Sequence, residues 1–229
     1  MVNNRVISCE HGGNELPVRF QPFFRNAQAA LNSHRGWDMG SSNVALRMAD
    51  AWHCPIHTQT TTRLLIDCNR SIGHARLFSQ WSKPLLQPEK DDCLESIYHP
   101  YRNALMRDIR TTIASSGQCI HLSVHSFTPV LDGQERKTDI GILYDPARKK
   151  EQSLATAWQE KIKKCVPAWS VHRNSPYRGI SDGFCTAIRK EFPPDQYLGL
   201  ELEINQKHST DNRTLMRIAD VLIETFPQV

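Results

Sequence analysis

The sequence has no CxxC pair, no long apolar run and no dense block of charge. Its seven cysteines are an odd number, and most lie in or beside apolar runs, where a free thiol packs as a small hydrophobe. No stretch of 18 apolar residues occurs, and the first residues, MVNNRVISCE, lack the apolar core of a signal peptide. We therefore expect a reduced, cytoplasmic protein that does not interact with membranes.

Charged residues are too scattered to indicate a nucleic-acid-binding surface. The formal net charge is +4, no five like charges adjoin, and no cluster combines aromatic and basic residues as RNA-binding motifs do. A mild positive excess suits an anionic small molecule. We expect a small carboxylate as the partner and no nucleic acid, and the oligomeric state stays open.

Short apolar runs of strand length alternate with longer segments of helical periodicity. The expected strands are residues 5–9, 63–67, 119–125, 139–144, 170–172 and 198–204. The expected helices are residues 41–53, 98–115, 149–164 and 210–225, the last capped by Ser209 or Thr210. This alternation predicts an α/β sheet covered on both faces. Because no linker or repeat interrupts it, we expect one domain over residues 1–229.

Clusters of polar residues follow or end the apolar runs. They are CEHGGNELP (9–17), GWDMGSS (36–42), RLLIDCNRS (63–71), HLSVHSFTP (121–129), NSPYRG (174–179) and LELEIN (200–205). In open α/β sheets, ligands bind where strands end. Several polar groups that converge from separate strands indicate a catalytic pocket more than a binding module.

Two of these clusters contain histidines that could bind a metal. His11 precedes two glycines, which let the backbone approach a bound group closely, and His125 closes an apolar run. A lone histidine is more often a hydrogen-bonded structural residue. Together they resemble two ligands of a catalytic zinc, which has three protein ligands and one open position. No HExxH motif names the third ligand, for which the candidates are Asp38, Glu15, Glu10 and Asn14.

The segment after the run LLI is suited to binding a carboxylate. The guanidinium of Arg70 matches a carboxylate in a bidentate manner, and Asn69 adds a directional amide. Asp67 could hold that guanidinium in place, or it could neutralise a nearby structural charge. The alternative is an ion pair at a strand end on the surface, worth about 0–1 kcal/mol.

The run LELEIN places its carboxylates on one side of a strand. Alternation puts Glu201, Glu203 and Asn205 on one face and the apolar residues on the other. Two carboxylates on one face are costly unless they meet a cation or share a proton. A glutamate beside an activated water is the usual general base for amide hydrolysis. The alternative is an edge strand with a solvated acidic face.

In this order, the motifs HGGN, WDMGSS, TRLLIDCNRS, HSFTP, DIGILYDP, NSPYRG and LELEIN resemble the N-formylglutamate amidohydrolase family, over about residues 7–206. That family is related to zinc carboxypeptidases and aspartoacylase. The resemblance implies a three-layer α/β sandwich with a mixed, mostly parallel sheet, helices on both faces and one catalytic zinc. It implies a metal-dependent amidohydrolase that removes a formyl-like N-acyl group from an acidic amino acid such as N-formylglutamate.

The resemblance also implies roles for individual residues. Asn69 and Arg70 match the segment with which aspartoacylase grips its substrate carboxylate. Glu203 matches the expected base, and Glu201 is then a neighbour that tunes it. On the substrate side, the resemblance points to a downstream arginine and the NxPY motif, which are Arg136, Asn174 and Tyr177.

One departure from the wider superfamily concerns the metal. Its members bind zinc through a His-x-x-Glu pair, but the residue three after His11 is Asn14. A neutral amide is a poor zinc ligand, so Asp38 is the preferred third ligand, ahead of Asn14 or Glu15. One zinc or another divalent ion per chain is expected. The alternative functions are a carboxypeptidase-like peptidase or γ-glutamyl hydrolase, and a non-enzymatic binder of an acidic ligand.

Overall fold

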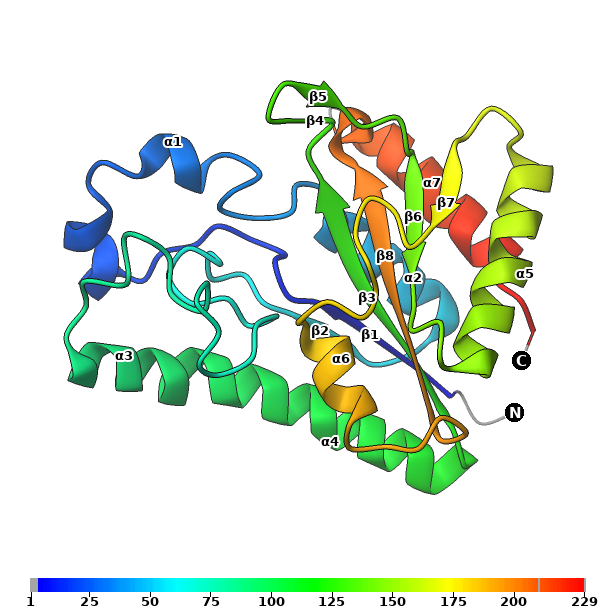
Figure 1. The fold of residues 1–229 in the computed structure, drawn as a ribbon, viewed down its shortest axis with the longest axis horizontal. Helices are drawn as coiled ribbons and strands as arrows, with labels where there is room; N and C mark the ends of the chain where they lie inside the picture. Colours follow the sequence, from blue (N-terminus) through cyan, green and yellow to red (C-terminus); the bar gives the residue numbers. More distant parts are fainter. Residues whose placement is uncertain (1–3, 210, 229) are drawn as a thin grey trace.

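A mixed sheet forms the centre of the computed structural model, which describes residues 4–209 and 211–228 (Figure 1). Within these residues six strands pair in the order β2-β1-β3-β8-β6-β7. Their bounds are β1 Arg5–Cys9, β2 Ile56–Thr58, β3 Cys119–Phe127, β6 Ile140–Leu143, β7 Val171–Arg173 and β8 Tyr197–Asn205. Only the β6–β8 pair is antiparallel among these neighbours. The mixed, mostly parallel sheet that the family resemblance implies is confirmed.

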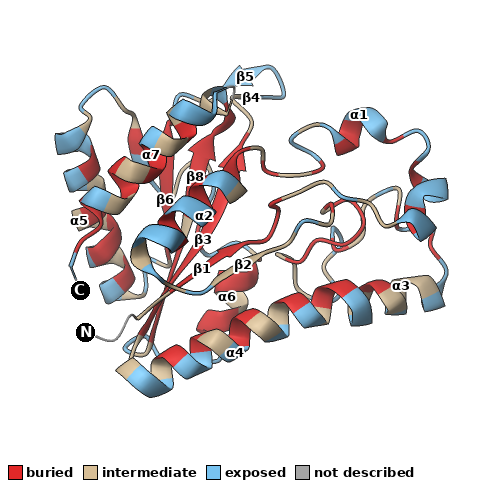
Figure 2. Cartoon of the chain, turned by 180° about the vertical axis from the view of Figure 1, so that it is seen from behind, coloured by how far each residue is buried: buried red, intermediate tan, exposed pale blue. Residues whose placement is uncertain are grey.

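Helices cover both faces of this sheet, which makes three layers (Figures 1 and 2). On one face lie α2 (Ser41–Trp52), α5 (Lys149–Cys165) and α7 (Asn212–Thr225). On the other lie α4 (His99–Ser116) and the short α6 (Phe184–Arg189). Smaller elements are the 3-10 helices Val18–Phe24 and Gln206–His208, α1 (Gln28–Leu31), α3 (Gln87–Cys93), the π-helix Leu94–Tyr98, and the hairpin β4 (Val130–Leu131) and β5 (Gln134–Glu135).

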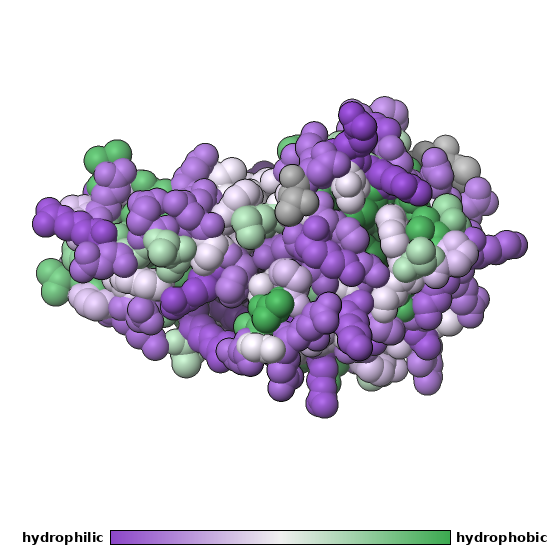
Figure 3. Space-filling model, turned by 90° about the horizontal axis from the view of Figure 1, so that it is seen from above, coloured by the Kyte–Doolittle hydropathy of each residue, from purple (hydrophilic) through white to green (hydrophobic). Residues whose placement is uncertain are grey.

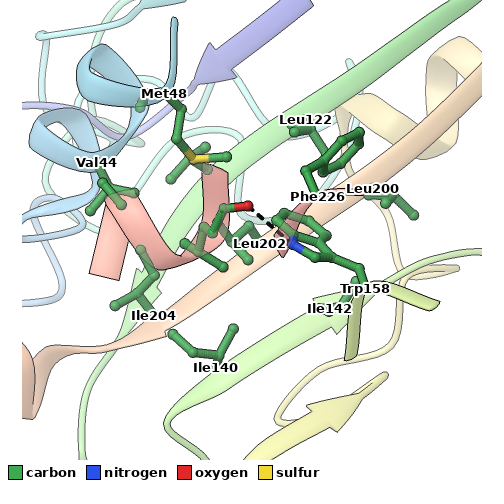
Figure 4. Close-up of a cluster of buried hydrophobic side chains, with 14 of the residues drawn as sticks. Val44, Met48, Leu122, Ile140, Ile142, Trp158, Leu200, Leu202, Ile204 and Phe226 are labelled. Atoms are coloured by element: carbon green, nitrogen blue, oxygen red, sulfur yellow. Dashed lines mark hydrogen bonds between the residues drawn. The ribbon is translucent and has the colours of Figure 1, made fainter. Parts of the chain in front are cut away.

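The larger core lies between the sheet and α2, α5 and α7 (Figure 4). Alternate residues of β3 and β8, among them Leu122 and Leu202, are fully buried there. Trp158 of α5 is also fully buried, and its indole N–H donates to the carbonyl of Leu222, 3.2 Å away. Each such large side chain contributes about 1.5–3 kcal/mol through burial. Because strand side chains alternate, the intervening positions of β3 and β8 face the opposite side of the sheet.

The expected strand at residues 63–67 is wrong. The segment folds as consecutive turns, in which the Leu65 N–H donates to Thr62 O (3.0 Å) and the Asp67 N–H donates to Leu77 O (2.9 Å). Its apolar residues are buried, but in the core that α4 covers. A short apolar run indicates burial without distinguishing a strand from a buried turn. On the side of β1 away from β3, the neighbouring strand is β2, which the sequence analysis did not expect and whose residues are half-buried.

The C-terminal helix begins later than expected. Asp211 is its N-cap and accepts hydrogen bonds from the N–H groups of Arg213 and Thr214. Ser209 is not the cap, since its hydroxyl donates to Met39 O; Thr210, the other expected cap, lies outside the described residues. The cysteines are all free and five are buried, as expected. No helix in the described part of the chain is long and apolar enough to cross a bilayer.

Candidate active site

A cavity of about 310 Å³ opens at the end of the sheet where β1, β3 and β8 terminate. Figure 3 views the molecule from this end, where hydrophilic side chains predominate. The polar groups that line the cavity include His11, Asp38, Arg63, Asn69, Arg70, His125, Tyr177, Asp182, Glu201 and Glu203. Most of the clusters expected to converge therefore meet in one place, at the strand ends where α/β sheets bind ligands.

The glycines after His11 allow the chain to leave β1 beside the segment that follows β2. The Gly12 N–H donates to Gln59 O and the Gln59 N–H donates to Cys9 O, both at 2.9 Å. A Cβ added to Gly12 would lie 2.4 Å from Thr58 Cγ2, and one added to Gly13 would lie 2.6 Å from Thr60 O. Only glycine permits this close approach. The pairing extends the sheet past β1 and fixes the backbone that carries His11.

Two histidines and one aspartate form a buried cluster at the base of the cavity. Asp38 Oδ2 lies 3.3 Å from His11 Nδ1 and 2.9 Å from His125 Nδ1. Their ligand atoms all lie within 4.8 Å of one another, and all three residues are buried. On the far side of its ring, His11 Nε2 is 2.7 Å from Asp67 Oδ1. A histidine held by a carboxylate behind it is typical of metal sites, so this cluster could hold a divalent ion.

The charges around this cluster favour ionised carboxylates. Burial alone would raise the pKa of Asp38, but His11 and hydrogen bonds from both histidines hold that pKa well below its usual range. The pKa of Glu10 is likewise held low against the effect of burial, through its hydrogen bond and charge interaction with His125. Burial lowers the pKa of His125, but Asp38 and Glu10 raise it well above the usual value. The cluster thus attracts positive charge strongly, whether protons or a metal ion.

Glu203 lies beside His125 on the neighbouring strand. The two residues are paired in the β3–β8 register, so their backbones are about 4.8 Å apart. Glu203 Oε2 is buried and has no hydrogen-bond partner among the described residues. Burial, with smaller contributions from Asp38 and Glu201, raises the pKa of Glu203 to about 8, although His125 opposes this shift. A carboxyl group with a pKa near neutrality is suited to accept and release a proton.

A glycine on β6 makes room for Glu203. Gly141 is its antiparallel partner, and a Cβ at this position would lie 3.2 Å from Glu203 Cβ and 2.2 Å from Ser175 O. Glu201 faces the same cavity, and burial also raises its pKa. The two carboxylates of the LELEIN run therefore point into the cavity, while its leucines face the core.

Arg63 is a cavity residue that the sequence analysis missed. Its guanidinium donates to Asp38 Oδ1 (3.4 Å) and to Asp67 Oδ2 (2.9 Å). Burial lowers its pKa, but Asp67 and Asp38 raise it further, so the net shift is upward. An arginine directly before the buried apolar run Leu64–Ile66 was the available signal, since such a charge needs a nearby partner.

Asn69 and Arg70 line the cavity, and both are already tied to the segment before and within α6. Asn69 Oδ1 accepts a hydrogen bond from the Phe184 N–H at 2.6 Å. Arg70 donates to Asp182 O, and its Nε lies 3.8 Å from Asp67 Oδ2. Asp182, also missed from sequence, accepts hydrogen bonds from the hydroxyl (2.6 Å) and the N–H (3.2 Å) of Ser71. These contacts join the loop of residues 61–76 to the loop of residues 174–183. The two loops together form one side of the cavity, which we call the loop wall.

The NxPY motif and Arg136 lie at the mouth. Tyr177 lines the cavity, and its hydroxyl accepts a hydrogen bond from Arg136 Nη1 at 2.8 Å. Arg136 and Asn174 are not among the described residues that line the cavity. Asn174 Oδ1 instead accepts hydrogen bonds from the N–H groups of Tyr144 (3.0 Å) and Gly179 (3.1 Å), which shapes the turn that presents Tyr177.

The other residues considered as third metal ligands point elsewhere. Asn14 donates to Leu31 O at 3.0 Å, and Glu15 accepts from the Thr60 hydroxyl at 2.7 Å. Glu10 reaches His125 only from the opposite side of the imidazole ring, 3.3 Å from Nε2. Asp38 is the candidate that the structure brings between the two histidines.

Comparisons with known proteins show the family and the fold. The family model for N-formylglutamate amidohydrolase matches residues 4–209. Among solved structures, the chain is similar to a gene product of Agrobacterium tumefaciens, with 25% identity and a TM-score of 0.85 over 98% of this chain and 89% of that one. It shares its fold with an N-formylglutamate amidohydrolase from Ralstonia eutropha, with 16% identity and a TM-score of 0.69 over 97% and 92% of the two chains. No curated protein matches the sequence.

Proposed function

This chain belongs to the N-formylglutamate amidohydrolase family and is an amidohydrolase, and we propose that it is a zinc-dependent enzyme that removes a formyl-like N-acyl group from an acidic amino acid such as N-formylglutamate. One observation carries the proposal. Glu203, with a buried and unpartnered oxygen, shares a cavity with the cluster of His11, Asp38 and His125.

The residues of the cluster fit a zinc ion. Two imidazole nitrogens and one carboxylate oxygen converge in a buried site, which is a common zinc donor set. In our proposal His11, Asp38 and His125 hold one ion per chain. When bound, the ion supplies Lewis acidity, which polarises the acyl carbonyl and lowers the pKa of water.

Glu203 moves the proton in the proposed reaction. Its carboxylate accepts a proton from the attacking water and then gives that proton to the nitrogen of the departing amine. A pKa of about 8 suits both transfers near neutral pH. Glu201, two residues earlier on the same face, contributes negative charge that helps to keep the pKa of Glu203 high.

The loop wall recognises the substrate carboxylates. Arg70 and Asn69 lie in the cavity with their positions fixed by Asp182 and Phe184, so little ordering is needed when a carboxylate binds. Tyr177, held by Arg136, contacts the substrate at the mouth of the cavity, and Asn174 acts through the turn that it shapes. Arg63 offsets the negative charge of Asp38 and Asp67.

A hydrolysis screen with the zinc-loaded protein tests this proposal. The substrates are N-formyl, N-acetyl and longer N-acyl derivatives of glutamate, aspartate and uncharged amino acids. We expect turnover of a short-acyl acidic substrate, and Glu203→Gln should lower kcat by about 10²–10⁴-fold with zinc still bound, because an amide cannot accept the proton. The exposed Glu15→Gln serves as the matched control and should behave as wild type. An absence of turnover on every N-acyl amino acid, or full activity of Glu203→Gln, would refute the proposal.

A further inference from the structure

We infer that Glu10, acting through Ser123, is a positioning residue that fixes the protonated nitrogen of His125 and leaves Nδ1 free for the metal. This inference rests on the proposed function, since it assigns a role at the metal cluster. It concerns the side of the His125 ring that faces away from the cluster.

Three buried side chains form a continuous hydrogen-bonded chain behind the cluster. The Ser123 hydroxyl lies 2.6 Å from Glu10 Oε2 and 2.8 Å from His125 Nε2. All three residues are almost completely buried, with exposed fractions of 1–3%. Water therefore does not compete for these hydrogen bonds.

The direction of this chain follows from the chemistry of its members. An ionised carboxylate can only accept, so Ser123 gives its single proton to Glu10. The Ser123 oxygen must then accept, and the donor is the Nε2–H of His125. In this structure His125 also donates a proton from Nδ1 to Asp38. A bound ion would replace that second proton, and because the Nε2 proton is held by Ser123, the ring would offer its lone pair from Nδ1.

The strands build this chain into the fold. Glu10 directly follows β1, and Ser123 lies on the adjacent parallel strand β3, where it pairs with Ser8. Ser123 and His125 are two residues apart on one face of β3. The Asp67 carboxylate contacts His11 Nε2 directly at 2.7 Å. The Glu10 carboxylate meets His125 Nε2 through the shorter contacts of the Ser123 hydroxyl, and its direct separation from Nε2 is 3.3 Å.

His121, which lies two residues before Ser123 on the same face of β3, provides an internal comparison. Its Nε2 lies 2.8 Å from the Ser8 hydroxyl and its Nδ1 lies 2.7 Å from the Tyr197 hydroxyl. Both partners are neutral, both ring nitrogens are occupied, and His121 is not part of the metal cluster. The serine–histidine contact is thus the same in the two places, and the carboxylate behind the serine distinguishes His125.

The experiment compares zinc affinity in Glu10→Gln, Ser123→Ala and Ser8→Ala by competition with a chelator. In Glu10→Gln the new side-chain amide can donate a hydrogen bond to Ser123. Ser123 can then donate to His125 Nε2, which reverses the direction of both hydrogen bonds and places the ring proton on Nδ1. We expect this variant to bind zinc about 10–100-fold more weakly. Ser123→Ala should lose less, because Glu10 Oε2 is 3.3 Å from His125 Nε2 and can accept directly. Ser8→Ala, which removes an equally buried hydroxyl from His121, should leave zinc affinity unchanged.

Side-chain ¹⁵N NMR of zinc-loaded wild type adds a readout that does not depend on a variant's folding, and His125 should carry its proton on Nε2. Equal zinc affinity in Glu10→Gln and wild type, or equal losses in Glu10→Gln and Ser8→Ala, would overturn the inference. If Glu10→Gln does not fold, an unchanged affinity in Ser123→Ala with a proton on Nδ1 of wild-type His125 would overturn it. If the wild type binds no divalent ion, the metal proposal fails together with this inference. If the wild type binds zinc and only the results above are contrary, the role of Glu10 fails alone.

Discussion

The two walls of the cavity are built on different principles. On the strand wall, His125 and Glu203 belong to a ladder in which β3 and β8 stay paired from Cys119–Tyr197 to Phe127–Asn205. The loop wall, formed by residues 61–76 and 174–183, has turns in place of strands. Contacts of individual side chains join its two segments, such as Asp182 with Ser71 and Asn69 with the Phe184 N–H.

In our proposal, this difference separates the residues of the chemistry, on the strand wall, from those of substrate recognition, on the loop wall. A central strand with an apolar face buried against α2, α5 and α7 cannot shift without exposing that core, so the strand wall holds its reactive groups rigidly. A neutral hydrogen bond on the loop wall, such as Asn69 with Phe184, contributes only about 0.5–1.5 kcal/mol, and one to the Asp182 carboxylate contributes about 1.5–3 kcal/mol. Substitutions on the strand wall should therefore abolish function, and those on the loop wall should weaken binding by degrees.

The largest effect is expected at the cluster of His11, Asp38 and His125. His11→Ala removes one of the three proposed ligands, so zinc content should fall from about one ion per chain to near zero. Metal analysis of protein purified without chelator measures this content. His57→Ala is the control, because His57 pairs with Asp108 outside the cavity and should leave the zinc content unchanged. Full metal occupancy in the His11 variant would show that the cluster is not the metal site.

An intermediate effect is expected at Arg70 on the loop wall. Lysine retains the positive charge but loses the planar fork, so Arg70→Lys should mainly raise KM for acidic substrates. The rise corresponds to a loss of about 2–3 kcal/mol in the free energy of substrate binding. Steady-state kinetics on N-acyl glutamates provide the measurement. Arg110→Lys, at an exposed pair with Glu191, serves as the control and should have little effect. A decrease in kcat at unchanged KM would place Arg70 in the chemistry and remove the contrast between the walls.

The smallest effect is expected at the contact that joins the two loops. Asp182→Asn weakens the hydrogen bonds from Ser71, which should destabilise the loop wall locally by about 0.5–1.5 kcal/mol. Hydrogen exchange at the Ser71 amide should become faster, while the amides of β3 and β8 keep their protection. Equal acceleration in loop and strands would indicate that the two walls open together.

The pH dependence of this contact sharpens the same test. Burial alone would raise the pKa of Asp182, but the hydrogen bonds from Ser71 lower it below its usual value. A lowered pKa means that the contact is fully stabilising above the ordinary aspartate pKa of about 3.9 and is lost as the pH falls through the lower folded value. Protection of the Ser71 amide in the wild type should decrease across that range, and Asp182→Asn should lack the decrease.

The sequence alone determined the parts of this protein that depend on local periodicity. Alternation within LELEIN placed Glu201 and Glu203 on the face opposite the leucines, and the same period placed Ser123 with His125. The four long helices and most strands of the main sheet could be read in the same way, whereas the short helices α1, α3 and α6 could not.

Only the tertiary structure decided how distant loops meet above the sheet. It brought Asp38 between His11 and His125, placed Arg63 against two aspartates, and folded residues 63–67 into turns instead of a strand. It also set Glu10 behind Ser123 and closed Asp182 onto Ser71. No periodic pattern specifies these contacts, because each depends on loops whose ends are fixed by different strands and on buried charges that must find partners across the cavity.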